Sequence, residues 1–438
     1  MTRPSFLARC GRQVWARGGL ALLLVALCGV AACGTGGSGP VVHVLGTWTG
    51  SEQDAFLAMV APFERQTGIK VDYQGSRDSD TVLADRVGNG TPPDLAVLAS
   101  PGKLVQYARA GRLAPLDDAL DLPGMTKQYG SSWVQLGAVD GKQYAVFVKA
   151  SVKSLIWYSP KALAAHGWTP PDSWDRLNAL DRLIAGSGVS PWCVGLESSS
   201  ASGWPGTDWL EDIVLAQSGP DVYDQWATGK LAWNSPQIKR AWQTWGDVIG
   251  TKGLVRGDAR GMLLTNFGAS GASLFNATPG CYFEHAASFI TGYYQQTDPR
   301  LKAGEDFDFT RFPIIDQAFG GTEEVAGDLL GMFHSTAAAR QLIAYLTTPE
   351  AQRIWVARGG ALSPNREVPG TAYPDALSRR LGQLLVDART VRFDASDLMP
   401  DAMQSAFYQA VLSFANDPSQ LDTVLSDLER VRTNVYAQ

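Results

Sequence analysis

Several classes of function are excluded by what this 438-residue chain lacks. Only 18% of its residues are charged, its net charge is −6 and it has no run of Lys and Arg, so clustered cations for nucleic acid are missing. Its four histidines are scattered without an H-E-x-x-H or C-x-x-C motif, which leaves zinc chemistry without support. No G-x-S-x-G nucleophile motif occurs. We expect no metal, no cofactor and a neutral ligand.

The sequence also lacks the loops that bind nucleotides. The Gly-Lys pairs at Gly102, Gly141 and Gly229 are never followed by the Ser or Thr that holds magnesium in a Walker loop. The G-x-G-x-x-G match at residues 34–39 has no strand before it and no helix after it, so it is interpreted as a flexible linker.

The composition is that of a globular protein. Hydrophobic residues make up 45% of the chain and there are 14 tryptophans, enough for a sizeable core. At roughly 150 residues per domain, the length predicts two to three domains.

The first 33 residues have the plan of an export signal. Four arginines precede the apolar run 20–30, which is too short to cross a bilayer, and Val30-Ala31-Ala32-Cys33 resembles a bacterial lipobox. We predict a lipoprotein signal peptide over 1–32, with Cys33 lipidated as a membrane anchor and 33–40 as its tether. The alternative is an ordinary secretory signal cleaved nearby.

The chain has five cysteines, and export determines which of them can form a disulfide. Two lie in the signal and one at the lipidation site, which leaves Cys193 and Cys281. Since an exported protein meets an oxidising compartment, we predict that these two form a disulfide. Two buried free thiols are the alternative.

From residue 41 the sequence alternates between strand and helix patterns. A buried strand at 41–45 precedes a helix with Ser51 as its expected N-cap, an apolar face from Phe56 to Phe63 and an end at Gly68. Strands at 69–73 and 95–99 and helices near 81–87 and 103–110 continue a β-α-β wound sheet. Ligands bind at the carboxyl ends of such strands, here the loops 46–52, 74–80 and 99–102.

A second α/β pattern follows residue 150. It has a strand at 154–159 and a helix after Ser173 that carries Leu177, Leu180, Leu183 and Ile184. Glycine-rich stretches at 198–207 and 268–280 are expected to be irregular and to line a site. The remaining apolar patterns predict helices at 337–346, 349–356, 407–414 and 421–431.

Stretches in a fixed order carry a family resemblance over residues 41–438. They are Trp48-Thr49-Gly50 before a helix, Gly90-Thr91-Pro92-Pro93-Asp94 before a strand, the runs 140–147 and 171–175, Thr348-Pro349-Glu350-Ala351-Gln352, and Met399-Pro400 before Phe407-Tyr408. In these the chain resembles the bacterial extracellular solute-binding proteins of carbohydrate importers, of the maltose-binding type. The runs 191–198, 203–209 and 392–400 resemble the α-glucoside-binding branch. The sequence departs from that branch at Ala99-Ser100 and at Glu284-His285-Ala286, so the identity of the sugar is left open.

The resemblance implies an α/β fold of the periplasmic-binding-protein type II: two wound lobes joined by a hinge that the chain crosses three times, at 148–152, 324–326 and 361–365. Lobe 1 would be 41–150 with 325–362, and lobe 2 would be 151–324 with 363–438. It also implies a monomer that delivers a sugar to the permease of an ABC transporter and touches the membrane only through its lipid anchor.

A sugar site needs aromatic platforms for C–H faces and charged partners for hydroxyls. We select candidate ligand-binding residues from three places: the strand ends and the hinge, the densest aromatic and polar cluster, and the positions that the family resemblance indicates. The candidates are Trp48, Glu52, Arg77, Asp78, Lys149, Glu197, Trp204, Thr207, Asp208, Phe267, Asp328 and Tyr408. For Trp48 the alternative is a core tryptophan, and for Trp209 we give core packing even weight.

Three other functions stay open at this point. A secreted glycosidase needs two carboxylates, which Glu197, Asp208 and Asp328 could supply. An adhesin or structural lipoprotein would bind no soluble ligand. A protein of the same fold could bind a non-sugar solute such as a polyol or a peptide.

Overall fold

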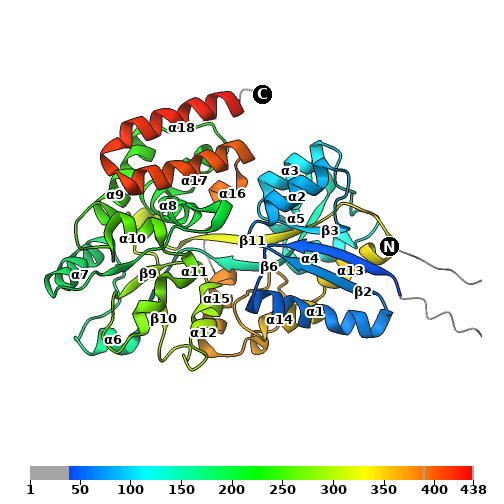
Figure 1. Ribbon diagram of the computed structural model, residues 1–438, viewed down its shortest axis with the longest axis horizontal. Helices are drawn as coiled ribbons and strands as arrows, with labels where there is room; N and C mark the ends of the chain where they lie inside the picture. The colour runs from blue at the N-terminus through cyan, green and yellow to red at the C-terminus, as the bar shows by residue number, and fades with distance from the viewer. Residues whose placement is uncertain (1–38, 388–389, 437–438) are drawn as a thin grey trace, which may run out of the picture. The chain divides into compact units, whose positions relative to one another are not determined.

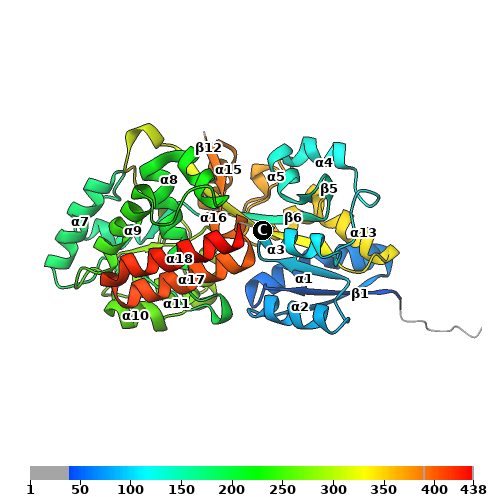
Figure 2. The ribbon, with the colours of Figure 1, turned by 90° about the horizontal axis from the view of Figure 1, so that it is seen from above.

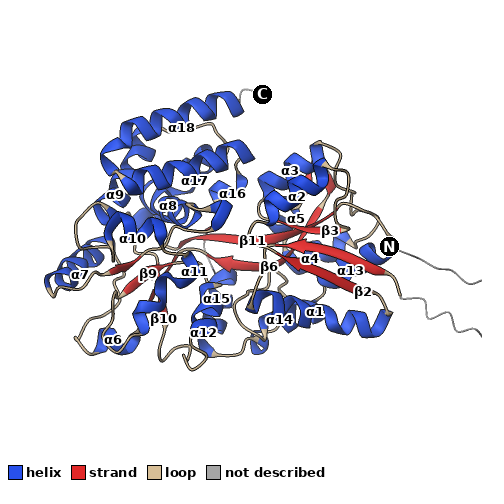
Figure 3. Ribbon diagram, in the orientation of Figure 1, coloured by secondary structure: helices blue, strands red, loops and turns tan. Residues whose placement is uncertain are grey.

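The computed structural model describes residues 39–387 and 390–436, which contain two large β-sheets, each covered by helices, and one two-stranded ribbon (Figures 1 and 3). This confirms the predicted α/β fold class. The lipobox, Cys33 and most of the tether lie outside the described residues. Within the described ranges no helix is both long enough and apolar enough to traverse a bilayer.

The sheet of the first lobe has the strand order β12-β11-β3-β1-β2, with β6 also paired to β11. Strand β12 comes from residues expected in lobe 2, but it joins this sheet by pairing with β11. Its strands are β1 (Val41–Gly46), β2 (Lys70–Gly75), β3 (Leu95–Leu98), β6 (Ala145–Val152), β11 (Thr322–Met332) and β12 (Thr390–Phe393), and a small ribbon is formed by β4 (Ala138–Val139) and β5 (Lys142–Gln143). Its helices are α1 (Ser51–Thr67), α2 (Ser79–Gly88), α3 (Pro101–Arg109), α4 (Leu122–Tyr129), α5 (Ser131–Leu136), α13 (Ala337–Leu346) and α14 (Pro349–Val356).

The parallel pairing of β1 with β2 and β3 is the predicted wound arrangement. Gly68 ends α1 with φ 72°, a left-handed conformation that glycine adopts without strain. The N-cap expectation was wrong by one residue: Gly50, with φ 57°, is the N-cap, and Ser51 is already helical. A glycine is favoured there because its positive φ turns the chain from β1 into the helix.

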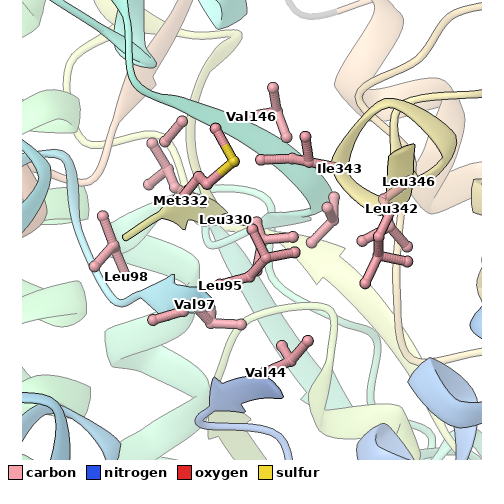
Figure 4. Close-up of a cluster of buried hydrophobic side chains, with 14 of the residues drawn as sticks. Val44, Leu95, Val97, Leu98, Val146, Leu330, Met332, Leu342, Ile343 and Leu346 are labelled. Atoms are coloured by element: carbon pink, nitrogen blue, oxygen red, sulfur yellow. The ribbon is translucent and has the colours of Figure 1, made fainter. Parts of the chain in front are cut away.

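The core of the first lobe lies between the sheet and its helices (Figure 4). Val44, Val97 and Leu330 come from three neighbouring strands, and Leu342 and Ile343 of α13 pack against them. All five side chains are buried, at 2% exposure or less. Burial of each such side chain stabilises the fold by about 1.5–3 kcal/mol relative to exposure.

The second lobe has a four-stranded sheet in the order β10-β7-β9-β8. Its strands are β7 (Leu155–Tyr158), β8 (Trp192–Cys193), β9 (Phe283–His285) and β10 (Asp308–Arg311). Its helices are α6 (Pro160–Ala164), α7 (Trp174–Gly186), α8 (Trp204–Ala227), α9 (Pro236–Ile249), α10 (Asp258–Leu264), α11 (Phe267–Ser270), α12 (Ile290–Thr297), α15 (Ala376–Asp387), α16 (Ala395–Leu398), α17 (Asp401–Asn416) and α18 (Leu421–Val435). The last two pack side by side (Figure 2).

The predicted disulfide is present in this lobe. Cys193 and Cys281 are bonded, with their Cα atoms 5.5 Å apart, and the bond ties β8 to the chain just before β9. It closes a separation of 88 residues, and a cross-link of that length restricts the unfolded chain strongly.

One expectation for this lobe was wrong. The stretches 198–207 and 268–280 are not irregular throughout, because α8 starts at Trp204 and the second stretch holds the end of α11 and a 3-10 helix at Gly271–Phe275. The helix predicted after Ser173 is present as α7, and of its apolar residues Leu177 and Ile184 are fully buried whereas Leu183 is 57% exposed.

Strands β6 and β11 run antiparallel from one lobe to the other (Figure 1). Lys149 pairs with Asp328 in their register, just before a bulge at Asp328–Leu329. A third chain segment lies beside them, because Ala150 and Leu362 exchange both backbone hydrogen bonds, at 2.7 and 3.0 Å. These three crossings place several charged side chains at the joint.

Candidate functional site

A cavity of about 170 Å³ lies where the two lobes meet at β6 and β11. The first lobe reaches it through three loops at the carboxyl ends of its strands, which were the loops predicted to bind ligand. Its lining residues are Thr47, Glu52, Arg77, Ala99, Lys149, Ser151, Lys153, Ser198, Ala201, Trp204, Asp208, Phe267, Phe289, Ala326, Gly327, Asp328, Asp394, Ser396, Asp397 and Tyr408.

On the first-lobe side the charges form a balanced group that we name the Lys149 cluster: Glu52, Arg77, Lys149 and Asp328. The Lys149 Nζ lies 2.5 Å from Glu52 Oε1 and 3.2 Å from Asp328 Oδ2, and Arg77 Nη2 lies 2.6 Å from Glu52 Oε2. Burial alone would raise the pKa of Glu52, but Lys149 and Arg77 outweigh it and hold that pKa below its usual value. The Glu52 carboxylate therefore stays charged, and both carboxylates of this cluster are paired with a cation.

On the second-lobe side lies the Lys153 cluster: Lys153, Asp208, Glu211, Glu324, Asp394 and Asp397. The Lys153 Nζ is 2.8 Å from both carboxylate oxygens of Asp208 and 2.9 Å from Asp394 Oδ2. One carboxylate oxygen from each of Asp208, Glu324 and Asp394 lies within 4.8 Å of the other two. In the described part of the chain no other group of three metal-binding side chains comes together in this way. The ammonium of Lys153 already fills the position between two of them.

The Lys153 cluster carries an excess of acid. Burial raises the pKa of Asp208 to about 8 even beside Lys153, and burial with the nearby Asp394 raises the pKa of Asp397 well above its usual value. Burial together with Glu211 does the same for Glu324. One ammonium cannot neutralise five carboxyls, so this side of the cavity holds protonated carboxyls near neutral pH.

Aromatic side chains form the walls of the cavity. Trp204 and Phe267 meet edge to face with their ring centroids 5.0 Å apart, and Phe289 and Tyr408 complete the walls. The Lys153 ammonium lies 4.9 Å from the Trp204 ring centroid. Flat rings beside charged groups are the combination that binds the C–H faces and hydroxyls of a polyhydroxylated solute.

The structure brings eight of the twelve predicted site residues to the cavity. They are Glu52, Arg77, Lys149, Trp204, Asp208, Phe267, Asp328 and Tyr408. Seven of them belong to the two charged clusters or contact them, because Phe267 lies beside Arg77 and Trp204 beside Lys153. The eighth is Tyr408, a candidate taken from the resemblance.

The other four predicted residues do not line the cavity. Trp48 lies in the core with no exposed surface and donates its indole N–H to Asp328 at 2.7 Å, so its ring cannot stack on a ligand here. Thr207 is buried in the first turn of α8 and bonds the Trp204 carbonyl. Glu197 accepts hydrogen bonds from Asn266 and the Ser199 amide. Trp209, as weighed above, packs in the core.

Asp78 is exposed at the edge of the joint between the lobes. Its Oδ1 lies 3.3 Å from the Ser200 amide of the second lobe. Another contact across the joint is made by Glu52, whose carboxylate accepts a hydrogen bond from the Tyr293 hydroxyl at 3.2 Å.

Sequence reasoning missed Lys153, Phe289, Asp394, Ser396 and Asp397. The signals were present: Lys153 is one residue beyond the predicted first crossing, and the last three lie in the run 392–400 that carried the resemblance. Nothing in their local sequence distinguished them from residues outside a site, since they approach the cavity only through folding.

Comparison with known proteins agrees with this architecture. The model of the family described as bacterial extracellular solute-binding protein matches residues 49–353. The chain belongs to this family. Family members bind solutes for ABC transporters and are not enzymes, which removes the glycosidase alternative, and the family implies an ABC permease as partner.

Two curated relatives cover almost the whole chain. The osmoprotective compounds-binding protein GgtB of Synechocystis sp. is 36% identical over 89% of this chain and 91% of its own length. The alpha-glucosides-binding periplasmic protein AglE of Rhizobium meliloti is 34% identical over 88% of this chain and 85% of its own. A solved chitin oligosaccharide binding protein shares the fold, with a TM-score of 0.79 at 19% identity over 92% of this chain and all of that chain.

Proposed function

We propose that this protein captures an α-glucoside, of disaccharide size or smaller, in the cavity between its lobes and delivers it to an ABC permease. The observation that carries the proposal is the lining: four aromatic walls next to paired carboxylates, two lysines and an arginine. The similarity to the alpha-glucosides-binding protein AglE supports the class of sugar. The volume of about 170 Å³ is below the roughly 300–1,000 Å³ of pockets for larger ligands, which favours a short solute.

Capture works by a clamp in this proposal. A ligand that touches Glu52 and Asp328 of one lobe and Trp204 and Asp208 of the other is bound better when the lobes are together. Such a ligand shifts the population toward closure in proportion to its difference in affinity for the two states. The closed form is then recognised by the permease, while Cys33 holds the monomer to the outer face of the membrane by its acyl chains. Scattering that gives the same dimensions with and without saturating ligand would contradict the clamp.

A second candidate ligand is a small osmoprotective solute such as a polyol. The relative GgtB, described as binding osmoprotective compounds, is as similar to this chain as AglE is. The departure from the α-glucoside-binding branch at Ala99, whose methyl group lines the cavity, also favours a ligand other than the usual α-glucoside.

A thermal-unfolding screen tests both candidates. The ligands are maltose, trehalose, sucrose, palatinose and glucose, with glycerol and a dipeptide for comparison. A ligand at about 100 times its Kd adds roughly 2.7 kcal/mol to the free energy of unfolding. Shifts with the α-glucosides alone support the first candidate, and a shift with glycerol alone supports the second. No shift with any sugar, together with one for the dipeptide, would overturn the carbohydrate assignment.

A further inference from the structure

Glu324 is a buried carboxyl that the ligand site does not use. It lies on β11 at the second crossing between the lobes, and its side chain has no exposed surface. Neither of its carboxyl oxygens accepts a hydrogen bond from the described residues. Its neighbour Glu323, by contrast, is paired with Arg311 at 2.5 Å. A buried carboxylate without any donor is costly, so Glu324 must gain a proton or a cation.

The groups that face Glu324 are mostly acidic. From α8 they are Asp208, Glu211, Asp212 and the Tyr223 hydroxyl; from the start of α16 comes Asp394; and Lys153 follows β6. Asp212 is already bonded to His285 at 2.8 Å and to Ser154, and Lys153 is bonded to Asp208 and Asp394. No free cation faces Glu324 from these elements.

We propose that Glu324 and the carboxyls around Lys153 form a proton-binding site of the hinge, which takes up protons when the lobes close on ligand. The proposal rests on the proposed function, because closure on a ligand drives the uptake. Asp208 and Asp397 line the cavity, so they meet water when the lobes separate and lose it when ligand fills the cleft, whereas Lys153 holds the pKa of Asp394 below its usual value. Loss of water disfavours the charged form of a carboxyl, and one ammonium cannot compensate for all of them.

The direction of the pH effect follows from linkage. The closed state binds more protons than the open state, so closure is favoured at low pH and loses that advantage as the pH rises through the raised pKa values, which for Asp208 is about 8. Each proton taken up weakens ligand affinity by up to tenfold for each unit of rising pH. An exported binding protein with this hinge captures solute better in an acidic medium.

Isothermal titration calorimetry with trehalose and maltose, in buffers of different ionisation enthalpy at pH 6, 7 and 8, counts the protons. We expect the wild-type full-length protein to take up protons on binding and its Kd to rise between pH 6 and pH 8. Glu324→Gln, which resembles the protonated side chain, is expected to reduce the uptake and to flatten the rise in Kd.

The matched control is Glu284→Gln. Burial raises the pKa of Glu284 to about 7, but this carboxyl is enclosed within the second lobe by Ser270 and Tyr294 and is not part of the Lys153 cluster, which borders the cavity. Its surroundings do not depend on closure, so the variant should keep the wild-type proton uptake. Uptake that falls equally in both variants, or is zero in the wild type, overturns the proposal.

A ligand-free measurement separates this proposal from the proposed function. Between pH 5.5 and 8.5 the Tm of the wild type should fall more steeply than that of Glu324→Gln, whether or not any sugar binds. Equal slopes would overturn the proton site even if sugars bind. If instead millimolar Ca²⁺ or Mg²⁺ raises the Tm of the wild type but not of Glu324→Gln, the group is a metal site and the proton proposal fails.

Discussion

Lys149 and Lys153 lie four residues apart in one stretch of chain at the hinge, yet they have opposite electrostatic surroundings. In the Lys149 cluster two cations meet two carboxylates, whereas in the Lys153 cluster one ammonium meets five carboxyls. The difference does not come from the lysines. It comes from what each lobe brings: Arg77 completes the first cluster, and the second receives acids from α8, β11 and the start of α16.

Two carboxyl groups on β11 show the same contrast between a paired and an unpaired acid. Asp328 accepts the Trp48 indole N–H at 2.7 Å and bonds Lys149, while Glu324, four residues earlier on the same strand, has no hydrogen-bond donor among the described residues. A balanced buried cluster presents fixed charges to a ligand over a wide pH range. An acid-rich one changes its charge with pH, so the two sides of one cavity should respond differently to the medium.

The largest effects on stability are expected when either lysine is replaced. Lys153→Met leaves Asp208 and Asp394 buried beside each other without a cation, and we expect a loss of about 3–5 kcal/mol in the free energy of unfolding at pH 7. Lys149→Met should cost less, because Arg77 still bonds Glu52 at 2.6 Å. Urea unfolding measures both, and equal losses would break the comparison.

Ligand affinity tests the aromatic wall on each side. Trp204→Ala removes the ring beside Lys153 and should raise the Kd of the bound sugar on the order of 30-fold, equivalent to about 2 kcal/mol. Phe289→Ala, beside Lys149, removes a smaller ring and should raise the Kd less. Calorimetric titration of both variants decides this, with circular dichroism as the control for folding; a larger effect for Phe289→Ala would reverse the assignment of the main wall.

The pH dependence of stability should have opposite signs in the two clusters. The pKa of Glu52 is lowered, so its stabilising contribution is present above about pH 4.3 and lost as the pH falls through the lower folded value. The pKa of Asp208 is raised to about 8, so its contribution is present at low pH and lost as the pH rises from about 4 to 8.

Urea unfolding of Glu52→Gln and Asp208→Asn from pH 3 to 9 measures these contributions. The difference between wild type and Glu52→Gln should shrink toward acid. The decline of wild-type stability toward alkaline pH, at most about 1.4 kcal/mol per unit for one proton, should be smaller in Asp208→Asn. Parallel profiles for the two variants would show that the clusters do not differ in protonation.

The smallest effect is expected at the exposed edge of the joint. Asp78→Asn alters an exposed hydrogen bond of 3.3 Å to the Ser200 amide, so the free energy of unfolding should change by less than about 0.5 kcal/mol. Sugar affinity should stay within about twofold of wild type. A large loss of affinity would place Asp78 in the ligand site after all.

Much of the fold could be predicted because its signals are local. The helices at 337–346 and 349–356 were predicted at their observed bounds, and Gly68 ends α1 as its position indicated. Three strand-end loops were expected to reach the ligand, and the cavity is lined by Thr47, Arg77 and Ala99 from them. Hydrophobic periodicity and turn chemistry act over a few residues, so the sequence displays them directly.

The roles of individual side chains were harder to predict, because they depend on contacts between distant parts of the chain. Trp48 and Trp204 both precede or begin a helix, but one is sealed in the core and the other lines the cavity. Lys153 resembles any exposed lysine in the sequence until Asp208 and Asp394 are brought to it.

The sequence by itself therefore determined the family, the wound α/β architecture, the disulfide pair and the chain segments that line the cavity. Only the tertiary structure decided which charges neutralise one another and which are left in excess. The reason is physical: secondary structure follows from short-range backbone and packing preferences, whereas the energy of a buried charge depends on every charge and donor within a few ångströms, wherever in the chain it originates.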